Sequence, residues 1–511
     1  MKRHSIDNWL SQELIAIKSA NLHRNLVEIS SPMGPEIEIN NEKFYQFASN
    51  NYLGLTIDSR VIASSMQGLD EFGTGTGGSR LVTGTSLLHK QLEKQIARFK
   101  KTEDAILFSS GYLANVGTIP SVMDKNDVIF SDELNHASVI DGCKLSKSKI
   151  VIYKHCDMDD LETKIKTNAG GKNKKMIATD SVFSMDGDIA PLDEIVKLCE
   201  KYECISMIDE AHATGILGKN GSGASEFFKL ENKIDICMGT LSKAIGSVGG
   251  YVAGSSELID FLKNKARSFI FDTSLPASCL MASMAGIKII QEDKSLRRAL
   301  KKNLKQLSDF LEKSEFNHLN SKTAIVPIII GDEKEALKIS EILFDNKIFV
   351  PAVRPPSVPA GESRIRITLM ALHNKKHIDK LIKVLKELKD VIRKPMKTNK
   401  MKTDKELRSF SLMLIEFEKF WSLLLGRKVN KKKAKLEYLK IKTQLTARQL
   451  AEKFNELYRQ TEEEKYVPHP ERWLKYERWN DQLTKTLEKE QIYRDEEGYI
   501  ISKEEWEKRR S

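Results

Sequence analysis

Short apolar runs rich in β-branched residues alternate with amphipathic stretches along the first 285 residues of this 511-residue chain. The runs lie at 104–110, 127–132, 149–155, 174–184, 204–210 and 235–240. Between them, residues 191–202 space their apolar side chains by three and four, which is the period of a helix. Strands that alternate with helices predict an α/β domain with a largely parallel sheet.

The pattern changes after about residue 285. Long helical stretches at 294–314 and 377–392 enclose apolar runs at 323–330 and 363–369, which predicts a smaller α+β domain. The predicted organisation is an N-terminal segment (1–45), a large domain (46–285), a small domain (286–396), and a basic linker with a helical tail module (397–511).

Composition marks the same boundary near residue 396. Only two of the 28 glycines lie after residue 400, whereas four of the five tryptophans do. Because glycine-rich loops let backbone approach a ligand closely, we expect the ligand chemistry before that boundary. The six cysteines are scattered singly, which is typical of a reduced, cytoplasmic protein. No apolar run approaches the roughly 20 residues of a membrane-spanning helix, so we expect no membrane partner.

Four polar features follow predicted strands, where an open parallel sheet places its ligand. The segment 109–117 opens a helix, whose free N–H groups suit a phosphate. His136 follows the second run, Asp209 lies at the end of the fifth, and His212 follows two residues after that run. Lys243 follows the sixth run, among small residues and glycines that favour a desolvated amine.

Each feature also has an ordinary structural explanation as a helix start, a surface histidine or a surface lysine. Metal ligation by Asp209 and His212 is a rival, but the spacing offers no third ligand, so we predict no metal site. Taken together, the features match what pyridoxal phosphate requires. It needs a lysine for attachment, a carboxylate for the pyridine nitrogen, a helix N-terminus for the phosphate and an aromatic ring on the cofactor face.

Residues about 5–393 resemble the α-oxoamine synthase family of fold-type I pyridoxal-phosphate enzymes. The stretches that carry the resemblance include FASNNYLGL (47–55), GTGGSRLVTGTSLLHKQLE (75–93), SGYLANVG (110–117), NHASVIDG (135–142), SVFSMDGDIAPL (181–192), IDEAHATGILG (208–218), GTLSKAIGSVGG (239–250), RSFIFDTSLPAS (267–278) and RPPSVPAGESRIRIT (354–368). The resemblance implies a large domain with a mainly parallel sheet and a small α+β domain.

The resemblance also implies roles for individual residues. Lys243 would attach the cofactor, Asp209 would pair with the pyridine nitrogen, and His136 would stack on the ring. The other implied cofactor contacts are His212 and Ser184 at the phenolic oxygen, and Gly111, Tyr112 and Thr240 around the phosphate. Thr273 would come from a neighbouring subunit, which implies a homodimer with shared active sites.

The amino-acid carboxylate would be held by Asn50 and Arg366, a role that suits a forked guanidinium. Arg24 matches an N-terminal substrate-binding arginine, and Ser357 lies near the expected acyl site. Three positions depart from the family pattern. Asp180 stands where glutamate is usual, Asn51 where aspartate is usual, and Ser357 where threonine is usual. The departure at Ser357 leaves the acyl-chain preference open.

The implied activity is the decarboxylative condensation of an amino acid with an acyl thioester. The stretches IDEAHATG, FIFDTSLP and RPPSVPAG imply L-alanine and a pimeloyl thioester, on CoA or a carrier protein, as in biotin synthesis. Glycine C-acetyltransferases, 5-aminolevulinate synthases, serine palmitoyltransferases and acyl-aminoketone signal synthases share the catalytic residues and remain alternatives.

Residues 416–482 resemble the C-terminal segment of phage replication proteins. The resemblance rests on FxxFW at 417–421, a lysine-rich stretch at 428–435 and PHPxxWLxxxRW at 468–479. We expect the aromatic residues to form a small helical core. The clustered lysines suit weak nucleic-acid binding. Docking of a partner protein and a fusion relic without a catalytic role are the alternatives.

A competing hypothesis for the whole chain is a replication-associated nucleic-acid-binding protein with an inactive synthase portion. An inactive synthase should have lost the attachment lysine or the pyridine-pairing aspartate. Lys243, Asp209, His212 and His136 are all present in register. The sequence therefore favours a working enzyme.

Overall fold

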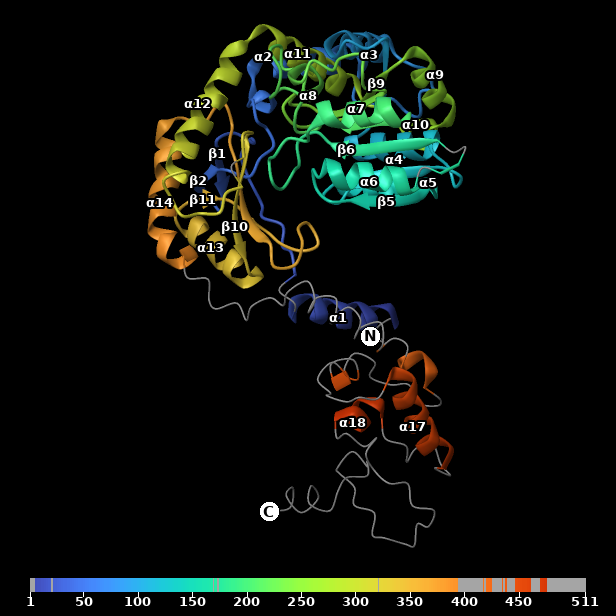
Figure 1. The fold of residues 1–511 in the computed structure, drawn as a ribbon. Helices are drawn as coiled ribbons and strands as arrows, with labels where there is room; N and C mark the ends of the chain where they lie inside the picture. The colour runs from blue at the N-terminus through green and yellow to red at the C-terminus, as the bar shows by residue number, and fades with distance from the viewer. Residues whose placement is uncertain are drawn as a thin grey trace. The chain divides into compact units, whose positions relative to one another are not determined.

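The computed structural model divides the chain into two compact units, Met1–Lys394 and Pro395–Ser511, which are described separately (Figure 1). In the first unit the structure describes residues 5–19, 22–168, 170–171, 174–319 and 321–393. In the second it describes residues 417, 420–424, 434, 437–438, 446–460 and 469–475.

A seven-stranded sheet lies at the centre of the first unit, in the order β3-β9-β8-β7-β6-β4-β5. Its strands are β3 (Asp104–Phe108), β4 (Val128–Asp132), β5 (Lys149–Tyr153), β6 (Lys175–Asp180), β7 (Ile205–Asp209), β8 (Ile236–Thr240) and β9 (Gly250–Gly254). β9 runs antiparallel to both of its neighbours, β3 and β8, and the pairs among β8, β7, β6, β4 and β5 are parallel. The predicted, mainly parallel sheet is therefore confirmed, and six of its strands are the six apolar runs.

Central strands of this sheet pack against a hydrophobic core on each face, since successive residues of a strand point to opposite sides. In β3, Ala105 and Leu107 belong to one hydrophobic core, whereas Ile106 and Phe108 belong to another. The helices α4, α5, α9 and α10 contribute to the second core, and α3, α7 and α11 to the first. Apolar residues that face both ways along a central strand are therefore what this fold requires.

The helices around this sheet follow the predicted pattern. Their bounds are α2 (Ser59–Phe72), α3 (Leu87–Lys100), α4 (Gly111–Val122), α5 (Ala137–Ser146), α6 (Met158–Asn168), α7 (Leu192–Tyr202), α8 (Ala224–Phe227), α9 (Ser256–Lys265), α10 (Arg267–Ile270) and α11 (Ala277–Glu292). A single helix, α1 (Ser5–Ser19), precedes them, and a short 3-10 helix, η1 (Leu55–Ile57), leads into α2.

Among the described residues of the first unit, two three-stranded sheets and three further helices lie outside the seven-stranded sheet and its helices. One sheet has the order β1-β2-β11, with β1 (Glu36–Ile39), β2 (Glu42–Gln46) and β11 (Ile348–Phe349). The other has the order β10-β13-β12, with β10 (Ile325–Gly331), β12 (Ala352–Val353) and β13 (Ser363–Thr368). The helices are α12 (Lys294–Leu311), α13 (Glu333–Asp345) and α14 (Lys375–Arg393).

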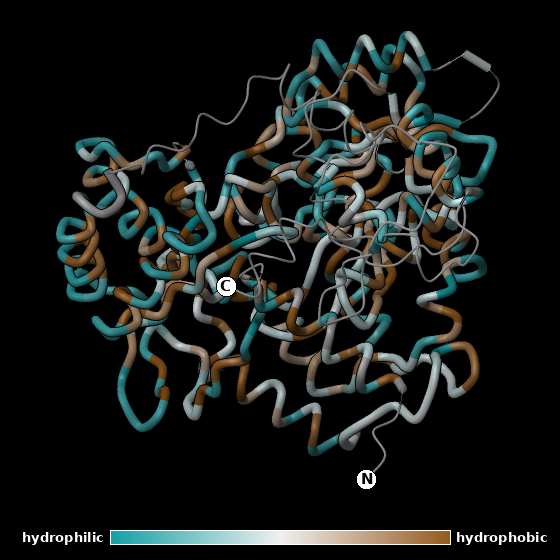
Figure 2. Tube along the Cα trace, turned by 90° about the horizontal axis from the view of Figure 1, so that it is seen from below, coloured by the Kyte–Doolittle hydropathy of each residue, from teal (hydrophilic) through white to brown (hydrophobic). Residues whose placement is uncertain are grey.

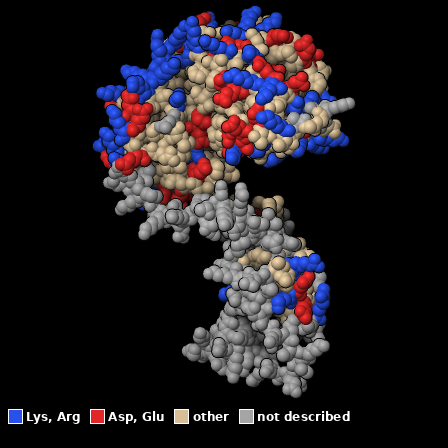
Figure 3. Space-filling view, viewed as in Figure 1, with Lys and Arg blue, Asp and Glu red and all other residues tan. Residues whose placement is uncertain are grey.

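The helices α12 and α14 show why this part of the chain folds as it does. In α12, Leu300, Leu307 and Leu311 are buried, whereas Lys301 and Lys302 are exposed. Helical turns of the tube in Figure 2 carry both hydrophobic and hydrophilic residues, and in Figure 3 Lys and Arg side chains gather over α12 and α14. Burial of one apolar stripe stabilises each helix more than its intrinsic propensity does.

In the second unit, the described residues include α17 (Ala447–Gln460) and α18 (Pro470–Lys475). Aromatic side chains form its core, in which Phe420 stacks on Trp473 with ring centroids 6.4 Å apart. Phe417 and Trp421 belong to the same core, so the predicted packing role of these aromatic residues is confirmed. In the lysine-rich stretch 428–435 only Ala434 is described, so the predicted basic patch lies outside the described residues. Among the described helices, none is long and apolar enough to cross a membrane.

Candidate active site

The carboxyl ends of the central strands bring most of the predicted site residues together. Asp209 is the last residue of β7, and Thr240 is the last residue of β8. His136 caps α5 after β4, and Gly111 opens α4 after β3. Parallel strands end at one edge of a sheet, so residues far apart in the chain share one site there.

Lys243 begins a chain of hydrogen bonds in this site. Its Nζ lies 2.8 Å from Nε2 of His212, and Nδ1 of that ring lies 2.6 Å from the hydroxyl of Tyr52. The Tyr52 hydroxyl donates to Oδ1 of Asn50 at 3.1 Å, and an Nη atom of Arg366 donates to the same oxygen at 3.1 Å. The lysine is therefore connected to the predicted carboxylate-binding pair through two buried rings.

Burial shifts the pKa values of Lys243 and His212, the first two members of this row of hydrogen bonds. It lowers the pKa of Lys243 from its ordinary value to about 8, although the nearby Asp209 and Asp180 carboxylates oppose that shift. Burial, with the positive charges of Lys243 and Arg366, also lowers the pKa of His212 well below its usual range. The imidazole is therefore neutral, and the amine loses its proton far more easily than an exposed lysine does.

Asp209 is buried and held by two donors. Its Oδ2 accepts from Nδ2 of Asn115 at 2.8 Å, and its Oδ1 accepts from the backbone N–H of Ala211 at 2.8 Å. Asn115 lies on α4, whose residues also reach Ser138 of α5. These two bonds fix the orientation of the carboxylate in the site.

His136 and Asp180 meet at the amino end of α5. The backbone N–H of His136 donates to Oδ2 of Asp180 at 3.2 Å, and the ring Nδ1 lies 2.8 Å from the hydroxyl of Ser138. Burial lowers the pKa of His136, which favours a neutral ring that can stack. Burial and the negative charge of Asp209 raise the pKa of Asp180 well above its usual range. Asp180 thus holds the backbone of His136, the residue predicted to stack on the cofactor ring.

The predicted phosphate site lies at the start of α4. Ser110 caps this helix by accepting from the backbone N–H of Leu113. A Cβ atom at Gly111 would lie 3.3 Å from Cβ of Thr240, so glycine lets the helix end approach β8 closely. The hydroxyl of Tyr112, which is half exposed, donates to Asp141 of α5. Free N–H groups at a helix start form a site for an anion.

Arg366 lies on β13 and reaches the loop after β6. Its Nε donates to the carbonyl oxygen of Ser184, and one Nη donates to Oγ1 of Thr368 at 2.8 Å. With the bond to Asn50, these contacts orient the guanidinium in the site. The structure therefore brings Ser184, Asn50 and Arg366 together.

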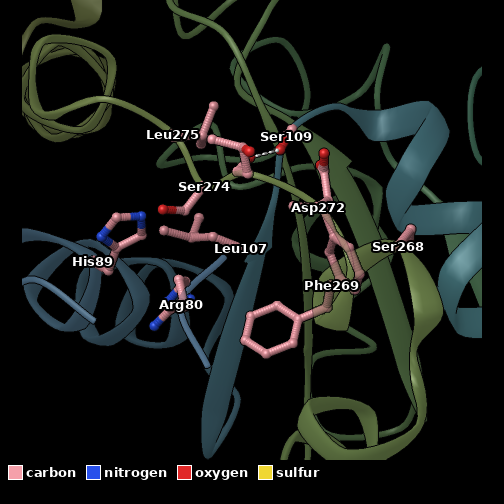
Figure 4. Close-up of a pocket in the computed structure, with 11 residues that line it drawn as sticks. Arg80, His89, Leu107, Ser109, Ser268, Phe269, Asp272, Ser274 and Leu275 are labelled. Atoms are coloured by element: carbon pink, nitrogen blue, oxygen red, sulfur yellow. Dashed lines mark hydrogen bonds between the residues drawn. The ribbon is translucent and has the colours of Figure 1, made fainter. Parts of the chain in front are cut away.

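A pocket beside β3 contains Thr273. Its lining comes from the end of β3, the start of α3 and the segment 268–275 (Figure 4). The hydroxyl of Ser109 donates to the carbonyl oxygen of Thr273 at 2.9 Å, within the same chain. The side chain of Thr273 is exposed, so its predicted contact with a second subunit stays a prediction.

Arg24 and Ser357 lie in a separate group of exposed residues. Arg24 donates to the carbonyl oxygen of Pro355 at 3.2 Å, and the Ser357 backbone N–H donates to the carbonyl oxygen of Arg354 at 3.1 Å. The N-terminal segment and the 354–357 segment are therefore neighbours. Their predicted substrate contacts stay predictions.

Two residues of the site, Tyr52 and Asn115, were not singled out from the sequence, and the contact of Asp180 with His136 was not predicted. Tyr52 and Asn115 lie inside stretches that carry the family resemblance, which is the signal that points to them. Their partners lie 160 and 94 residues away in the chain, so spacing alone cannot reveal these contacts.

One group of potential metal ligands lies among the described residues. It comprises Asp132, His155 and Cys156, whose ligand atoms lie within 4.8 Å of one another. Nδ1 of His155 already lies 3.0 Å from Asp132, and Nε2 lies 2.8 Å from Asp188. Both ring nitrogens are therefore engaged by carboxylates.

The residues fit pyridoxal phosphate in chemistry as well as in position. A buried amine with a lowered pKa suits attachment to an aldehyde, and a buried, oriented carboxylate suits a ring nitrogen. Gly111 is the first residue of α4 and has no side chain, so the start of this helix lies close to Thr240 at the expected phosphate site. A seven-stranded, mainly parallel sheet with this site defines a pyridoxal-phosphate-dependent transferase of fold type I.

Comparison with known proteins identifies the family. The model described as "Aminotransferase class I and II" matches residues 42–385. An 8-amino-7-oxononanoate synthase from Lysinibacillus sphaericus is 50% identical over 377 residues, which are 74% of this chain and 97% of that protein. An 8-amino-7-oxononanoate synthase 2 from Bacillus subtilis is 47% identical over 377 residues, 74% of this chain and 96% of that protein. The chain belongs to the 8-amino-7-oxononanoate synthases, within that aminotransferase family.

Solved structures of related enzymes share the fold. A serine palmitoyltransferase from S. paucimobilis, with pyridoxal phosphate bound, has a TM-score of 0.72 and 30% identity. The match covers 76% of this chain and 99% of that chain. An 8-amino-7-oxononanoate synthase from Francisella tularensis has a TM-score of 0.59 and 29% identity, covering 68% and 98% of the two chains.

Proposed function

We propose that this chain condenses L-alanine with a pimeloyl thioester and releases carbon dioxide and the free thiol. The product would be 8-amino-7-oxononanoate, a step of biotin synthesis, and the thiol would be CoA or a carrier protein. The observation that carries the proposal is the hydrogen-bonded chain from Lys243 to Arg366 in a protein 50% identical to a synthase of that name.

Lys243 and Asp209 have different roles in the proposed reaction. When bound, pyridoxal phosphate supplies an electron sink for the charge that develops on the α-carbon of the amino acid. Nζ of Lys243 removes the α-proton, and its lowered pKa of about 8 makes the neutral amine available near neutral pH. Asp209 supplies the negative charge for the ring nitrogen, and Nζ of Lys243 returns a proton after carbon dioxide leaves.

Arg366 and Asn50 would hold the carboxylate of the amino acid. Arg366 donates to protein oxygens of Ser184, Thr368 and Asn50, and these bonds fix the plane of the guanidinium. A fork held in one plane binds a planar carboxylate with little loss of side-chain entropy. The neutral ring of His136 would cover the cofactor face.

An assay of thiol release tests this proposal. Pimeloyl-CoA and pimeloyl-carrier protein are each paired with alanine, glycine or serine, and the products are identified by mass. Formation of 8-amino-7-oxononanoate from alanine supports the proposal. Turnover only with another pair would move the chain to a sister activity with the same residues.

A sister activity is the second candidate, and one observation favours it. The serine palmitoyltransferase from S. paucimobilis has a TM-score of 0.72, above the 0.59 of the Francisella synthase. Shared fold does not decide the substrate, because members of one fold differ in the pocket that receives the acyl chain. Serine with a long-chain acyl-CoA is therefore included in the same assay.

We propose a homodimer in which Thr273 completes the neighbouring site. The glycine-rich loop and the Thr273 segment are joined, since Thr76 donates to the carbonyl oxygen of Ser274 at 2.9 Å. Near this junction Val82 and Phe271 are 83% and 71% exposed. Large apolar side chains grouped on a surface suit a protein interface. Sedimentation of the full chain, with and without Phe271→Ser, tests the proposal.

The tail module, 397–511, is proposed to be appended to a complete synthase. The chain spans 97% of the Lysinibacillus synthase with 74% of its own length, so about a quarter of this chain lies beyond that match. Weak nucleic-acid binding by the tail stays a prediction, which salt-dependent binding of single-stranded DNA would test. A cytoplasmic location is part of the same proposal and is supported by six free cysteines.

A further inference from the structure

Tyr52 lies between His212 and Asn50 in the site and has no role in the steps of the proposed reaction. The residue is 1% exposed, lies before η1 and comes from a segment 160 residues away from His212. Its hydroxyl contacts two groups, Nδ1 of His212 at 2.6 Å and Oδ1 of Asn50 at 3.1 Å. A buried hydroxyl with one proton can donate to only one of them.

The acceptor oxygen of Asn50 decides where that proton goes. An amide oxygen only accepts, so Tyr52 donates to Asn50 and must accept from Nδ1–H of His212. Nε2 is then the unprotonated nitrogen of a neutral ring, and it faces Nζ of Lys243 at 2.8 Å. The position of the proton on the Tyr52 hydroxyl therefore sets which atom donates in each hydrogen bond between Asn50 and Lys243.

We propose that Tyr52 is a positioning residue that holds His212 in a single tautomer and ties it to Asn50. The Tyr52 hydroxyl therefore links the orientation of His212 beside Lys243 to the orientation of Asn50, which would bind the carboxylate. The inference rests on the proposed function in one respect, that Asn50 and Arg366 receive the carboxylate of the amino acid.

The charges around Tyr52 are consistent with this role. Burial raises the pKa of Tyr52 to about 12, against the opposing charge of Arg366. The hydroxyl therefore keeps its proton over the pH range in which the enzyme would work. Burial also keeps His212 neutral, and a neutral ring has two tautomers that only its hydrogen bonds distinguish.

The test uses the full chain loaded with pyridoxal phosphate and compares Tyr52→Phe with Tyr251→Phe. Tyr251 is a matched control, since it is also 1% exposed and its hydroxyl contacts Thr214 at 3.1 Å, outside this chain of bonds. The two readouts are the pH midpoint of the bound cofactor's absorption band and the alanine dissociation constant from spectral titration. Neither readout needs an acyl donor.

Tyr52→Phe is expected to move the pH midpoint by about one unit and to weaken alanine binding about tenfold. Tyr251→Phe should leave the pH midpoint unchanged and the alanine dissociation constant within about twofold of the wild type. If Tyr52 acts through His212, the double variant Tyr52→Phe with His212→Gln should have the same pH midpoint as His212→Gln alone.

An unchanged midpoint and unchanged alanine affinity in Tyr52→Phe would overturn the inference. Equal changes in both phenylalanine variants, with lower melting temperatures, would overturn it too, because they would indicate a packing role. Alanine binding by the wild type is measured before either variant is tested. Failure of the wild type to bind alanine would count against the proposed function. The two failures are therefore distinguishable.

Discussion

The imidazole of His155 is joined to Asp188 by a 2.8 Å hydrogen bond from Nε2, on the side of the ring opposite Asp132. Carboxylates only accept, so a ring with both nitrogens bonded to them carries a positive charge. Asp188 closes the tight turn that contains Ser184, where its carbonyl oxygen accepts from the N–H of Phe183. His155 thus anchors one side of the turn that Arg366 contacts from the other.

Replacement of His155 by Gln should destabilise the fold in a pH-dependent way. Burial opposes the charge on His155, but the bonds to Asp132 and Asp188 prevail and raise its pKa to about 12. A raised pKa stabilises the fold fully below the unfolded value of about 6.5, and this contribution declines as pH rises toward 12. The cost of the substitution, about 2–3 kcal/mol at pH 6, should therefore shrink at pH 9.

Urea unfolding of both proteins at the two pH values measures this difference. The variant Lys164→Gln, which removes an ion pair on the neighbouring helix α6, is the control and should show little pH dependence. A cost for His155→Gln that grows with pH would contradict the assignment of charge.

Lys243→Ala should abolish turnover while leaving the protein folded. The substitution removes the amine that attaches the cofactor and moves the α-proton, so a loss of at least about a thousandfold is expected. Lys243→Arg is the matched variant, since it keeps a positive charge without a usable amine, and it should be equally inactive. Thiol release and circular dichroism measure the two effects, and normal turnover in either variant would contradict the role of Lys243.

Attachment of pyridoxal phosphate to the cofactor-free chain should depend on pH through Lys243. Only the neutral amine attacks an aldehyde, and burial lowers the pKa of Lys243 to about 8. The attachment rate should therefore rise about tenfold per pH unit below 8 and level off above it. Stopped-flow absorbance from pH 6 to 10 gives this profile. A midpoint near 10.5, as for an exposed lysine, would show that burial has no such effect.

Lys100→Met should be strongly destabilising, because it leaves Glu210 as a buried charge without its cation. Lys100 and Glu210 are 0% exposed at their side chains, and Lys100 also donates to Oγ1 of Thr214 at 3.0 Å. Removing one partner of such a pair costs about 3–5 kcal/mol.

The adjacent Lys101 supplies the control, since its side chain is 58% exposed and pairs with Glu231 at the surface. Lys101→Met should leave the free energy of unfolding nearly unchanged. Adding Glu210→Gln to Lys100→Met should recover part of the loss, because the unpaired charge is then removed. Equal costs for the two lysines would contradict the buried-pair argument.

Removal of the tail after Lys394 should leave the synthase reaction intact. The chain divides into compact units at that point, and the predicted catalytic residues all lie in the first. We expect kcat/KM of the shortened chain to stay within about twofold of the full chain. A large loss of activity, with unfolding unchanged, would show that the tail takes part in the reaction.

The order of structural elements and the positions of the main site residues could be predicted from the sequence. Apolar runs of strand length identified six strands of the central sheet, and polar residues at or shortly after their ends identified Asp209, His136 and Lys243. This works because a strand buried on both faces must be apolar throughout, so its polar end stands out. The ninth strand, at 250–254, lacked that signal because it follows a glycine-rich segment.

The contacts that set protonation could not be predicted in this way. Tyr52 meets His212, and Asn115 meets Asp209, across 160 and 94 residues of chain. Which side chains face each other there depends on how helices pack on the sheet, and no local pattern records that packing. The lowered pKa of Lys243 likewise comes from burial by residues of several elements.

The sequence alone therefore determined the α/β fold class, the family and the residue types that chemistry with pyridoxal phosphate requires. Only the tertiary structure decided that Tyr52 and His155 take part, since each acts through partners from distant segments. The reason is that strand and helix patterns are local properties of the chain, whereas hydrogen-bond direction and desolvation belong to the packed whole.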